Sequence, residues 1–595
     1  MVRSHVLICG GSGCSALGSA ALADALNREI GAKNLAGEVR VGTTGCFGIC
    51  GQGPVMVVYP EGSCYVKVKE SDIPEIVSEH LIKGKIVSRL LYHETGGPDV
   101  VESLNGTSYY KKQLRVALRN CGVIDPENID EYIAEDGYQA LGRCLTEYTP
   151  QKVIEIVSAS GLRGRGGAGF PTGTKWKLAA QSVSDQKYVC CNADEGDPGA
   201  FMDRSVLEGD PHVILEAMAI AGYAIGANQG YIYVRAEYPI AVKRLKIAIE
   251  QARQYGLFGK NILGTGFDFD IDIRLGAGAF VCGEETALMT SIEGFRGEPR
   301  PRPPYPAVKG VFGQPTILNN VETFANVPRI ILLGAEWFAS MGTDRSKGTK
   351  VFALGGKINN TGLVEIPIGT TLREIVEDIG GGCPGGKRFK AAQTGGPSGG
   401  CISTANMDVP IDYDNLTSIG SMMGSGGLIV MDEDNCMVDM AKFFLDFTVD
   451  ESCGKCSPCR IGTKRMYEIL ERITEGNGKL EDLDTLEELC SHVKNNSLCA
   501  LGQTAPNPVL SMMHNFREEY LAHIEGKRCP AGVCKSMLSY YILAEKCKGC
   551  TLCAKACPVN AISGERRQPH TIDRNLCIKC GACMDTCKFD AIVRK

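Results

Sequence analysis

The stretches CKGCTLCAKACPVN (547–560) and CIKCGACMDTCKFD (577–590) carry the strongest pattern in this 595-residue chain. Each has the spacing C-x2-C-x2-C-x3-C. The surrounding segment is too poor in apolar residues to form a stable core without bound metal or another cross-link. Three thiolates at this spacing fit three corners of a four-iron cluster, and the fourth Cys is placed to reach a second cluster. The end of the chain is therefore predicted to fold around two [4Fe–4S] clusters.

The two halves of this segment are expected to exchange their fourth ligands. The predicted ligands are Cys547, Cys550, Cys553 and Cys587 for one cluster, and Cys577, Cys580, Cys583 and Cys557 for the other. Lys588 follows Cys587, where the first half has Pro558, and this difference does not touch ligation. A zinc-binding Cys cluster is the alternative, although zinc sites rarely double this spacing. The segment resembles bacterial two-cluster ferredoxins along its whole length.

The composition indicates that many of the 28 Cys bind metal. The chain opens MVRSHVLICGGSGC, which lacks the basic and apolar regions of a secretory signal, so we expect a cytoplasmic protein with clustered thiols and few disulfides. The net charge of −6, with no basic block, argues against nucleic acid and anionic membranes as partners. The most apolar stretch, His212 to Val234, is interrupted by Glu216 and predicts a buried helix followed by a strand, not a membrane span.

A third four-iron cluster is predicted in the helical region near residue 450. ESCGKCSPCR (451–460) has the spacing C-x2-C-x2-C, and another Cys follows in SLCALGQTAPNP (497–508). Three near ligands and one distant ligand suit a [4Fe–4S] cluster, with zinc as the alternative. The predicted ligands are Cys453, Cys456, Cys459 and Cys499.

The N-terminal region is predicted to hold a [2Fe–2S] cluster. Cys9 and Cys14 form C-x4-C, and Cys46 and Cys50 form C-x3-C, so two loops offer four thiolates. Zinc or simple buried cysteines are the alternatives. The combination resembles the thioredoxin-like ferredoxin domain of respiratory complexes.

A glycine-rich loop, GLRGRGGAGFPTGTKW (161–176), indicates a phosphate site. A helix-like segment precedes its GxGxxG pattern, whereas a Rossmann site requires a strand, and the loop lacks the Gly-Lys-Ser/Thr order of a P-loop. Its exposed backbone and Lys175 suit an anion, and a glycine hinge is the alternative. The acidic CNADEGDPGAFMDR (191–204), the Glu284–Glu285 pair and the Asn319–Asn320 pair add polar groups. Together these segments indicate a nucleotide or flavin site.

The region from about residue 110 to 525 closely resembles the NADH-oxidising flavoprotein subunit of respiratory complex I. The resemblance rests on motifs in the same order: GRGGAGFPTG, NADEGDPGAF, YIYVRAEY, GAGAFVCGEETAL, PRPPYPA, NNVETFANV, ESCGKCSPC and SLCALGQTAPNP. It implies FMN contacts at Gly164, Arg165, Gly166, Gly167, Lys175, Asn192, Asp194, Glu195, Gly283, Glu284, Asn319, Asn320 and Thr323. It also implies that Phe170 and Tyr305 stack on the dinucleotide, whose polar groups Asp197 and Glu285 bind.

Two positions depart from that family. Phe280 stands where Tyr is frequent, and Asp197 replaces a longer Glu, which puts that nucleotide contact in doubt. In the family, a carboxylate such as Glu285 near the adenosine ribose repels a 2′-phosphate, so the resemblance favours NAD(H) over NADP(H). No side-chain acid or base is expected for hydride transfer, because the flavin carries the chemistry.

The chain joins an N-terminal [2Fe–2S] domain and a C-terminal two-cluster domain to the flavoprotein region. This domain order is similar to that of the beta subunit of soluble NAD-dependent, often electron-bifurcating, hydrogenases. This resemblance implies FMN, NAD(H), one [2Fe–2S] and three [4Fe–4S] clusters. The implied partners are a hydrogenase catalytic subunit, a small thioredoxin-like [2Fe–2S] subunit and ferredoxin. The alternatives are the same module in an NAD-dependent formate dehydrogenase and an electron-transfer scaffold without an active flavin site.

HIEGKRCPAGVC (523–534) lies just before the tail and offers further metal ligands. His523, Cys529 and Cys534, with Cys490 upstream, are predicted to hold a structural zinc, and ordinary buried thiols are the alternative. The other nine Cys, among them Cys436, are interpreted as packing residues or loop neighbours.

The predicted fold is multidomain, of mixed α+β and α/β class. Five domains are expected: a thioredoxin-like [2Fe–2S] domain (1–90), a Rossmann-like FMN- and NADH-binding α/β domain with its connector (91–340), a β-grasp-like domain (341–425), a helical bundle with a [4Fe–4S] cluster (426–525) and a two-cluster ferredoxin-like domain (526–595).

Overall fold

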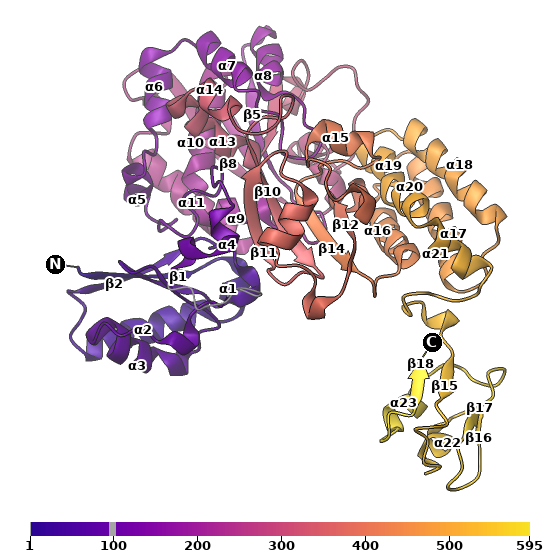
Figure 1. The fold of residues 1–595 in the computed structure, drawn as a ribbon. Coiled ribbons are helices and arrows are strands. Elements are labelled where there is room, and N and C mark those ends of the chain that lie inside the picture. The colour runs from indigo at the N-terminus through magenta and orange to yellow at the C-terminus, as the bar shows by residue number, and fades with distance from the viewer. Residues whose placement is uncertain (1, 94–102, 595) are drawn as a thin grey trace. The chain divides into compact units, whose positions relative to one another are not determined.

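The computed structural model describes residues 2–93 and 103–594. Residues 94–102, at the start of the connector predicted from residue 91, lie outside the described residues. The chain forms two compact units (Figure 1). The first contains the residues up to Met431 together with Leu498–Leu501, and the second contains Asp432–Ser497 and the chain from Gly502 onward.

The first unit begins with a four-stranded sheet in the order β2-β1-β3-β4. Its strands are β1 (Ser4–Cys9), β2 (Val39–Thr44), β3 (Met56–Tyr59) and β4 (Ser63–Tyr65). Its helices are α1 (Ser12–Ala16), α2 (Ser19–Ala32) and α3 (Ile73–Glu75). Helix α2 buries Leu22, Leu26 and Ile30, four residues apart, against Val6, Ile8 and the other inward residues of the sheet. The predicted strand HVLICGG, helix and strand VMVVY are present as β1, α2 and β3.

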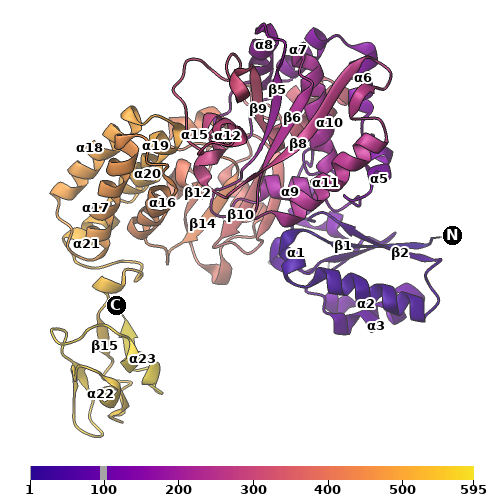
Figure 2. The same ribbon diagram turned by 180° about the vertical axis from the view of Figure 1, so that it is seen from behind.

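The second sheet has the order β7-β8-β6-β5-β9, and Figure 2 shows β5, β6, β8 and β9 lying side by side. Its strands are β5 (Tyr188–Ala193), β6 (Gln229–Arg235), β7 (Gly259–Ile262), β8 (Phe267–Gly276) and β9 (Thr316–Asn320). Strand β5 pairs in parallel with β6 on one side and β9 on the other. The chain moves outward from β5 to β6 and β8, and returns to β9 on the opposite side. This reversal makes the carboxyl ends of β5 and β9 the topological switch point, where open α/β sheets bind ligands.

Helices pack around this second sheet. They are α4 (Ser108–Lys111), α5 (Ile129–Ala134), α6 (Gln139–Glu147), α7 (Pro150–Ala159), α8 (Thr172–Gln181), α9 (Met202–Gly209), α10 (Pro211–Ile225), α11 (Pro239–Gln254), α12 (Glu285–Ile292), α13 (Val321–Leu333) and α14 (Ala335–Ala339). Helix α10 packs on β5, β6 and β8 and is buried at nearly every position. The apolar stretch His212 to Val234 thus forms the predicted buried helix and strand.

The third sheet has the order β11-β10-β14-β12-β13. Its strands are β10 (Thr349–Gly356), β11 (Gly362–Pro367), β12 (Phe389–Thr394), β13 (Cys401–Ser403) and β14 (Gly427–Asp432), accompanied by α15 (Tyr413–Ser418). Strand β14 is central and pairs in parallel with β10. The domain end predicted at residue 425 is therefore too early, because it omits a strand that completes the sheet.

The second unit contains a helical part and a small tail. The helices are α16 (Met437–Glu451), α17 (Lys464–Thr474), α18 (Glu481–Asn496), α20 (Pro506–Asn515) and α21 (Arg517–Ile524); the short α19 (Ala500–Thr504) begins at the end of the first unit. The tail contains α22 (Leu552–Ala556), α23 (Ala582–Thr586) and the strands β15 (Tyr540–Ile542), β16 (Ile562–Ser563), β17 (Thr571–Ile572) and β18 (Ile592–Arg594). The strands form the ribbons β15–β18 and β16–β17.

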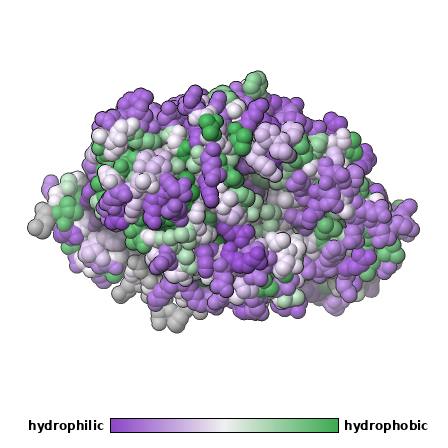
Figure 3. Space-filling view, turned by 90° about the horizontal axis from the view of Figure 1, so that it is seen from above, coloured by the Kyte–Doolittle hydropathy of each residue, from purple (hydrophilic) through white to green (hydrophobic). Residues whose placement is uncertain are grey.

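Among the described residues, none of the helices is both long and apolar enough to cross a membrane. On the face drawn in Figure 3, hydrophobic residues are scattered among hydrophilic ones.

Candidate functional site

The asparagines predicted to bind FMN lie at the switch point. Asn192, the last residue but one of β5, lies opposite Asn320 of β9, and Asn319 lies opposite Cys191. Asn192 donates to the carbonyl of Gly283 over 2.9 Å and accepts from the backbone N–H of Asp194 over 3.0 Å. These bonds bring two loops, distant in sequence, to one edge of the sheet.

The second pair of asparagines is also held by protein partners. The indole N–H of Trp176 donates to Asn319 over 2.9 Å. Asn320 caps α13 and donates its amide N–H to the buried carboxylate of Asp203. The amide orientations at the switch point are therefore set before any ligand binds.

The glycine-rich loop crosses this edge with its backbone close to the asparagines. A Cβ on Gly166 would lie 3.1 Å from the Cβ of Asn320, and Gly167 has φ of +128°, which only glycine adopts readily. The backbone N–H of Arg165 donates to the hydroxyl of Thr323 over 2.8 Å. The Arg165 guanidinium points into the protein and donates to the carbonyls of Arg163 and Lys347. The FMN contact predicted at Arg165 therefore meets a side chain and a backbone N–H that already have partners in the protein.

Lys175 and the Glu284–Glu285 pair lie together. The Lys175 ammonium donates to the carbonyl of Leu318 over 2.9 Å and lies 3.7 Å from Glu285. Burial lowers the pKa of Lys175, and the Glu285 carboxylate opposes that shift. Glu284 caps α12, accepting from the backbone N–H groups of Thr286 and Ala287. Arg302 pairs with Glu285 at 2.6 Å, a partner that no sequence spacing indicated.

The acidic loop after β5 points its carboxylates inward. Glu195 accepts from the backbone N–H groups of Asp203 and Arg204, at 2.9 and 3.1 Å. Burial raises the pKa of Glu195, of Asp203 and, to about 6, of Asp197. Asp197 accepts from the hydroxyl of Ser425, in the loop before β14. The dinucleotide contact predicted for Asp197 therefore competes with an internal partner.

The predicted aromatic pair is free to meet a planar ligand. Phe170 is 48% exposed and Tyr305 is 60% exposed, so both rings are accessible to a ligand. The site thus combines glycine backbone, an ammonium and amides at the carboxyl ends of the parallel strands β5 and β9, and Phe170 belongs to the same glycine-rich loop. The backbone, ammonium and amides fit the phosphate and ring edge of a flavin nucleotide, and the two aromatic rings are those expected to stack on the dinucleotide.

The four N-terminal thiols converge. The Sγ atoms of Cys46 and Cys50 are 3.4 Å apart, and the Cys9 thiol is hydrogen-bonded with those of Cys14 and Cys46. The pKa of Cys46 is lowered by hydrogen bonds from Cys50 and Cys9 and by the backbone N–H of Gly48. Four mutually adjacent thiols, three of them buried, fit the ligand set of a [2Fe–2S] cluster.

The tail groups its cysteines into the two predicted ligand sets, in which each half of the segment supplies the fourth ligand of the other. One cavity is lined by Cys547, Cys550, Cys553 and Cys587, and it also contains the buried His570. Another cavity is lined by Cys557, Cys577, Cys580 and Cys583. Each set combines three thiols from one half with one from the other, and so fits a [4Fe–4S] cluster.

Cys453, Cys456 and Cys459 lie between α16 and α17, and the hydroxyl of Ser452 is 3.2 Å from the Cys459 thiol. Burial raises the pKa of Cys459 to about 11. Cys499 belongs to Leu498–Leu501, which is grouped with the other unit, so its place as the fourth ligand stays a prediction.

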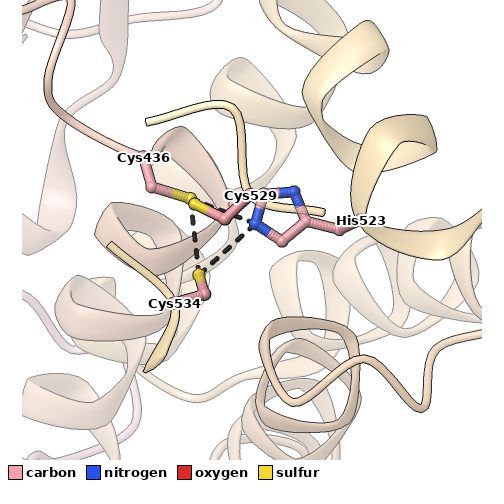
Figure 4. A group of neighbouring side chains, drawn as sticks. All are labelled: Cys436, His523, Cys529 and Cys534. Carbon is pink, nitrogen blue, oxygen red and sulfur yellow. Dashed lines mark hydrogen bonds between the residues drawn. The ribbon is translucent and has the colours of Figure 1, made fainter. Parts of the chain in front are cut away.

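A Cys3His group lies in the second unit (Figure 4). Cys436, His523, Cys529 and Cys534 offer ligand atoms that all lie within 4.8 Å of one another. The sulfurs of Cys436 and Cys534 are 3.7 Å apart, and the Nε2 of His523 lies 3.4 and 3.3 Å from them. A zinc tetrahedron with Zn–S near 2.3 Å and Zn–N near 2.0 Å requires separations of about 3.8 and about 3.5 Å.

The prediction of Cys490 as a ligand in this group is wrong, and the structure places Cys436, which was assigned to packing, in the group instead. Cys490 lies in α18 and is buried outside the group, where burial raises its pKa. Cys436 caps α16 and is 87 residues from His523, so no local spacing could reveal it. The His523 Nδ1 bonds to the carbonyl of Glu519 over 2.7 Å, which leaves Nε2 for a metal.

Comparison with known families finds matches along most of the chain. Five family patterns match: "Thioredoxin-like [2Fe-2S] ferredoxin" (1–81), "Nuo51 FMN-binding domain" (157–329), "SLBB domain" (351–402), "NADH-ubiquinone oxidoreductase-F iron-sulfur binding region" (439–523) and "4Fe-4S dicluster domain" (546–591). The fold and sites thus define a multidomain protein with FMN-binding and iron–sulfur domains, and the predicted fold class is confirmed.

Similar proteins include the NADP-reducing hydrogenase subunit HndC of Solidesulfovibrio fructosivorans, 63% identical over 82% of this chain and 99% of the relative. An NADH-quinone oxidoreductase subunit of Rhizobium meliloti is 47% identical over 70% of this chain and 99% of the relative. A solved NAD+-reducing [NiFe]-hydrogenase chain matches with TM-score 0.62 and 29% identity, covering 88% of this chain and 84% of its own. The chain belongs to the family that joins these hydrogenase chains with their counterparts in NADH-quinone oxidoreductase. The resemblance drawn from the motifs is confirmed.

Proposed function

We propose that the chain transfers hydride between NAD(H) and FMN and passes electrons singly through one [2Fe–2S] and three [4Fe–4S] clusters. The main support is the switch-point site. There the glycine-rich loop, which includes Lys175, lies against Asn320, and Asn192 is paired with Asn320 in the sheet. FMN supplies the exchange between two-electron and one-electron transfer when bound. The family relationship supports the same proposal.

In this scheme the side chains and loop backbone bind FMN and the dinucleotide and orient them for hydride transfer. The loop backbone and the Lys175 ammonium would hold the phosphate, and Asn192 would fix the ring edge through its link to Gly283. Phe170 and Tyr305 would stack on the dinucleotide. These contacts position the nicotinamide for hydride transfer without a side-chain acid or base.

NADP(H) is the second candidate coenzyme, and one contact favours it. Glu285 was expected to repel a 2′-phosphate, but Arg302 at 2.6 Å and Lys175 at 3.7 Å compensate its charge. Arg302 also offers a guanidinium to a phosphate. The relative HndC bears the name of an NADP-reducing hydrogenase subunit. The ratio of kcat/KM for NADH to that for NADPH decides between the two.

Anaerobic mixing of the purified protein with NADH tests the flavin site. The native chain should contain FMN, and its flavin absorbance should bleach. Lys175→Ala should lower FMN affinity at least tenfold, because it removes the charge-assisted contact to the phosphate. Lys177→Ala, two residues on and exposed in the same helix, is the matched control and should bind FMN normally. A native chain without FMN and without bleaching would instead support the scaffold alternative.

We propose further that the chain works in a hydrogenase complex with a hydrogen-activating subunit and a small thioredoxin-like [2Fe–2S] subunit, exchanging electrons with ferredoxin by bifurcation. Membership of the hydrogenase branch at 63% identity supports this proposal. Mass spectrometry of anaerobically copurified subunits tests it. A formate dehydrogenase subunit in place of a hydrogenase subunit would redirect the proposal to formate. Full turnover with NADH and no ferredoxin would contradict bifurcation.

We also propose that Cys436, His523, Cys529 and Cys534 hold a structural zinc. The support is the match of their separations to a tetrahedron, together with the oriented His523 ring. Burial by itself would lower the pKa of His523, and the Cys436 and Cys529 thiols raise it to about 10. Zinc binding would have to displace the proton that this shift favours on the imidazole, because a metal-bound His is neutral.

Zinc analysis of two matched variants tests this site. Cys436→Ser should lose most of the bound zinc and lower the temperature at which the second unit unfolds, because a structural zinc contributes folding free energy. Cys490→Ser, also at a buried cysteine of the same unit, should keep the zinc. Unchanged zinc in the Cys436 variant, or loss only in the Cys490 variant, would contradict the assignment.

A further inference from the structure

Helix α9 (Met202–Gly209) is bonded at its first turn to the acidic loop that follows β5. The Glu195 carboxylate accepts from the backbone N–H groups of Asp203 and Arg204. The Asp203 side chain, in turn, accepts from Asn320 at the switch point. The start of α9 therefore keeps a defined position relative to the proposed FMN contacts.

The other end of α9 contacts both ligand loops of the two-iron site. Glu208, 1% exposed, accepts from the backbone N–H of Ser12 over 2.9 Å and from the Ser12 hydroxyl. Ser12 lies between Cys9 and Cys14. The second loop packs on Gly209, since a Cβ on Gly45 would lie 2.4 Å from its Cα. The Glu208 carboxylate, from the FMN-binding domain, thus anchors the Cys9–Cys14 loop of the N-terminal domain, 196 residues away in the sequence.

We propose that Glu208 is a positioning residue for the [2Fe–2S] cluster and that its buried negative charge lowers the reduction potential of that cluster. The inference rests on the proposed ligands Cys9, Cys14, Cys46 and Cys50. Reduction adds one electron and therefore one negative charge to the cluster. A carboxylate close by in a region of low dielectric constant disfavours that added charge.

The groups around Glu208 favour its ionised form. The two Ser12 donors are directed at the carboxylate, and the Arg204 guanidinium lies 3.9 Å away. Burial raises the pKa of Glu208, and these donors and cations oppose the shift. Arg244 donates to the backbone carbonyl of Glu208 and also lies beside Gly10, so it holds the same junction from the other side.

The test is an EPR-monitored redox titration of the reconstituted full-length protein. Glu208→Gln keeps the shape and a hydrogen-bond acceptor but removes the charge. At the potential where the native two-iron cluster is half reduced, the ratio of reduced to oxidised cluster should rise about tenfold, a positive shift of about 59 mV. Glu250→Gln, at an exposed glutamate of α11, should leave the midpoint unchanged.

Ser12→Ala is the second variant, and it keeps the carboxylate. At a pH where Glu208 stays ionised, loss of the hydroxyl donor leaves its charge less compensated, so the midpoint should move in the negative direction. Opposite shifts in the two variants would support an electrostatic role, which a purely structural contact would not produce. If the native two-iron signal is present and neither variant shifts it, the role of Glu208 is refuted. If the native protein has no two-iron signal, the ligand assignment itself fails.

Discussion

Gly362→Ala should remove the two-iron cluster from the protein. A Cβ on Gly362, at the start of β11, would lie 1.7 Å from the carbonyl oxygen of Gly48, between Cys46 and Cys50. That oxygen also accepts from the backbone N–H of Leu363 over 2.8 Å and from the hydroxyl of Tyr109 over 2.8 Å. The clash is with backbone held by two hydrogen bonds, so the cysteine loop has to move away. Anaerobic iron analysis together with the two-iron EPR signal measures the loss.

Gly355→Ala provides the matched control for this prediction. Gly355 lies in β10, the strand next to β11, and a Cβ there meets nothing within 4 Å. This variant should keep its iron and its two-iron signal. A Gly362→Ala protein with the full two-iron signal would show that the loop does not depend on this contact.

The buried ion pair between Lys350 and Glu322 should give the second large effect. Lys350 of β10 is 0% exposed and Glu322 of α13 is 1% exposed, so the pair links helix α13 to the third sheet. The Lys350 ammonium also donates to the carbonyls of Val351 and Ser425. Lys350→Met leaves a buried carboxylate without its cation, which typically costs about 3–5 kcal/mol. For a domain of this size that corresponds to a fall of roughly 6–20 °C in the unfolding temperature.

The loss should grow as the pH rises. Burial raises the pKa of Glu322 above that of the unfolded chain, and Lys350 opposes this shift in the native protein. Without Lys350, the folded state binds more protons than the unfolded state. The variant therefore loses stability as the pH rises above the ordinary carboxyl pKa. Differential scanning calorimetry at several pH values measures this dependence.

The double variant Lys350→Met/Glu322→Gln is the control for the ion pair. It removes both charges, so it should recover most of the stability lost in the single variant. A double variant as unstable as Lys350→Met would show that packing, and not the unpaired charge, causes the loss.

The elements near the flavin site were largely predictable, because they depend on short-range pattern. The apolar run His212 to Val234 predicted a buried helix and strand, which α10 and β6 form. The glycine-rich loop and the Asn319–Asn320 pair were recognised as ligand-binding segments. The switch point between β5 and β9 could not be read from these motifs, because it depends on the order of strands in the sheet.

The contacts of the charged residues were harder to predict than the residues themselves. Arg165 was expected to face FMN, yet its guanidinium is buried on the carbonyls of Arg163 and Lys347. Glu285 was expected to repel a 2′-phosphate, yet Arg302 compensates its charge. A side chain's partner depends on which loop packs beside it, and local sequence carries little information about that.

Local spacing was sufficient to group most of the cluster thiols, whereas the distant partners required the fold. Cys547, Cys550 and Cys553 are so close along the chain that a single turn brings them together, whatever surrounds them. Cys436 meets His523 across 87 residues, and Ser12 meets Glu208 across 196. Such pairs form only when helices and loops have packed, because no backbone geometry links residues so far apart. The sequence could therefore indicate iron–sulfur and flavin chemistry, and the tertiary structure alone selected Cys436 over Cys490 and placed a buried carboxylate beside the two-iron site.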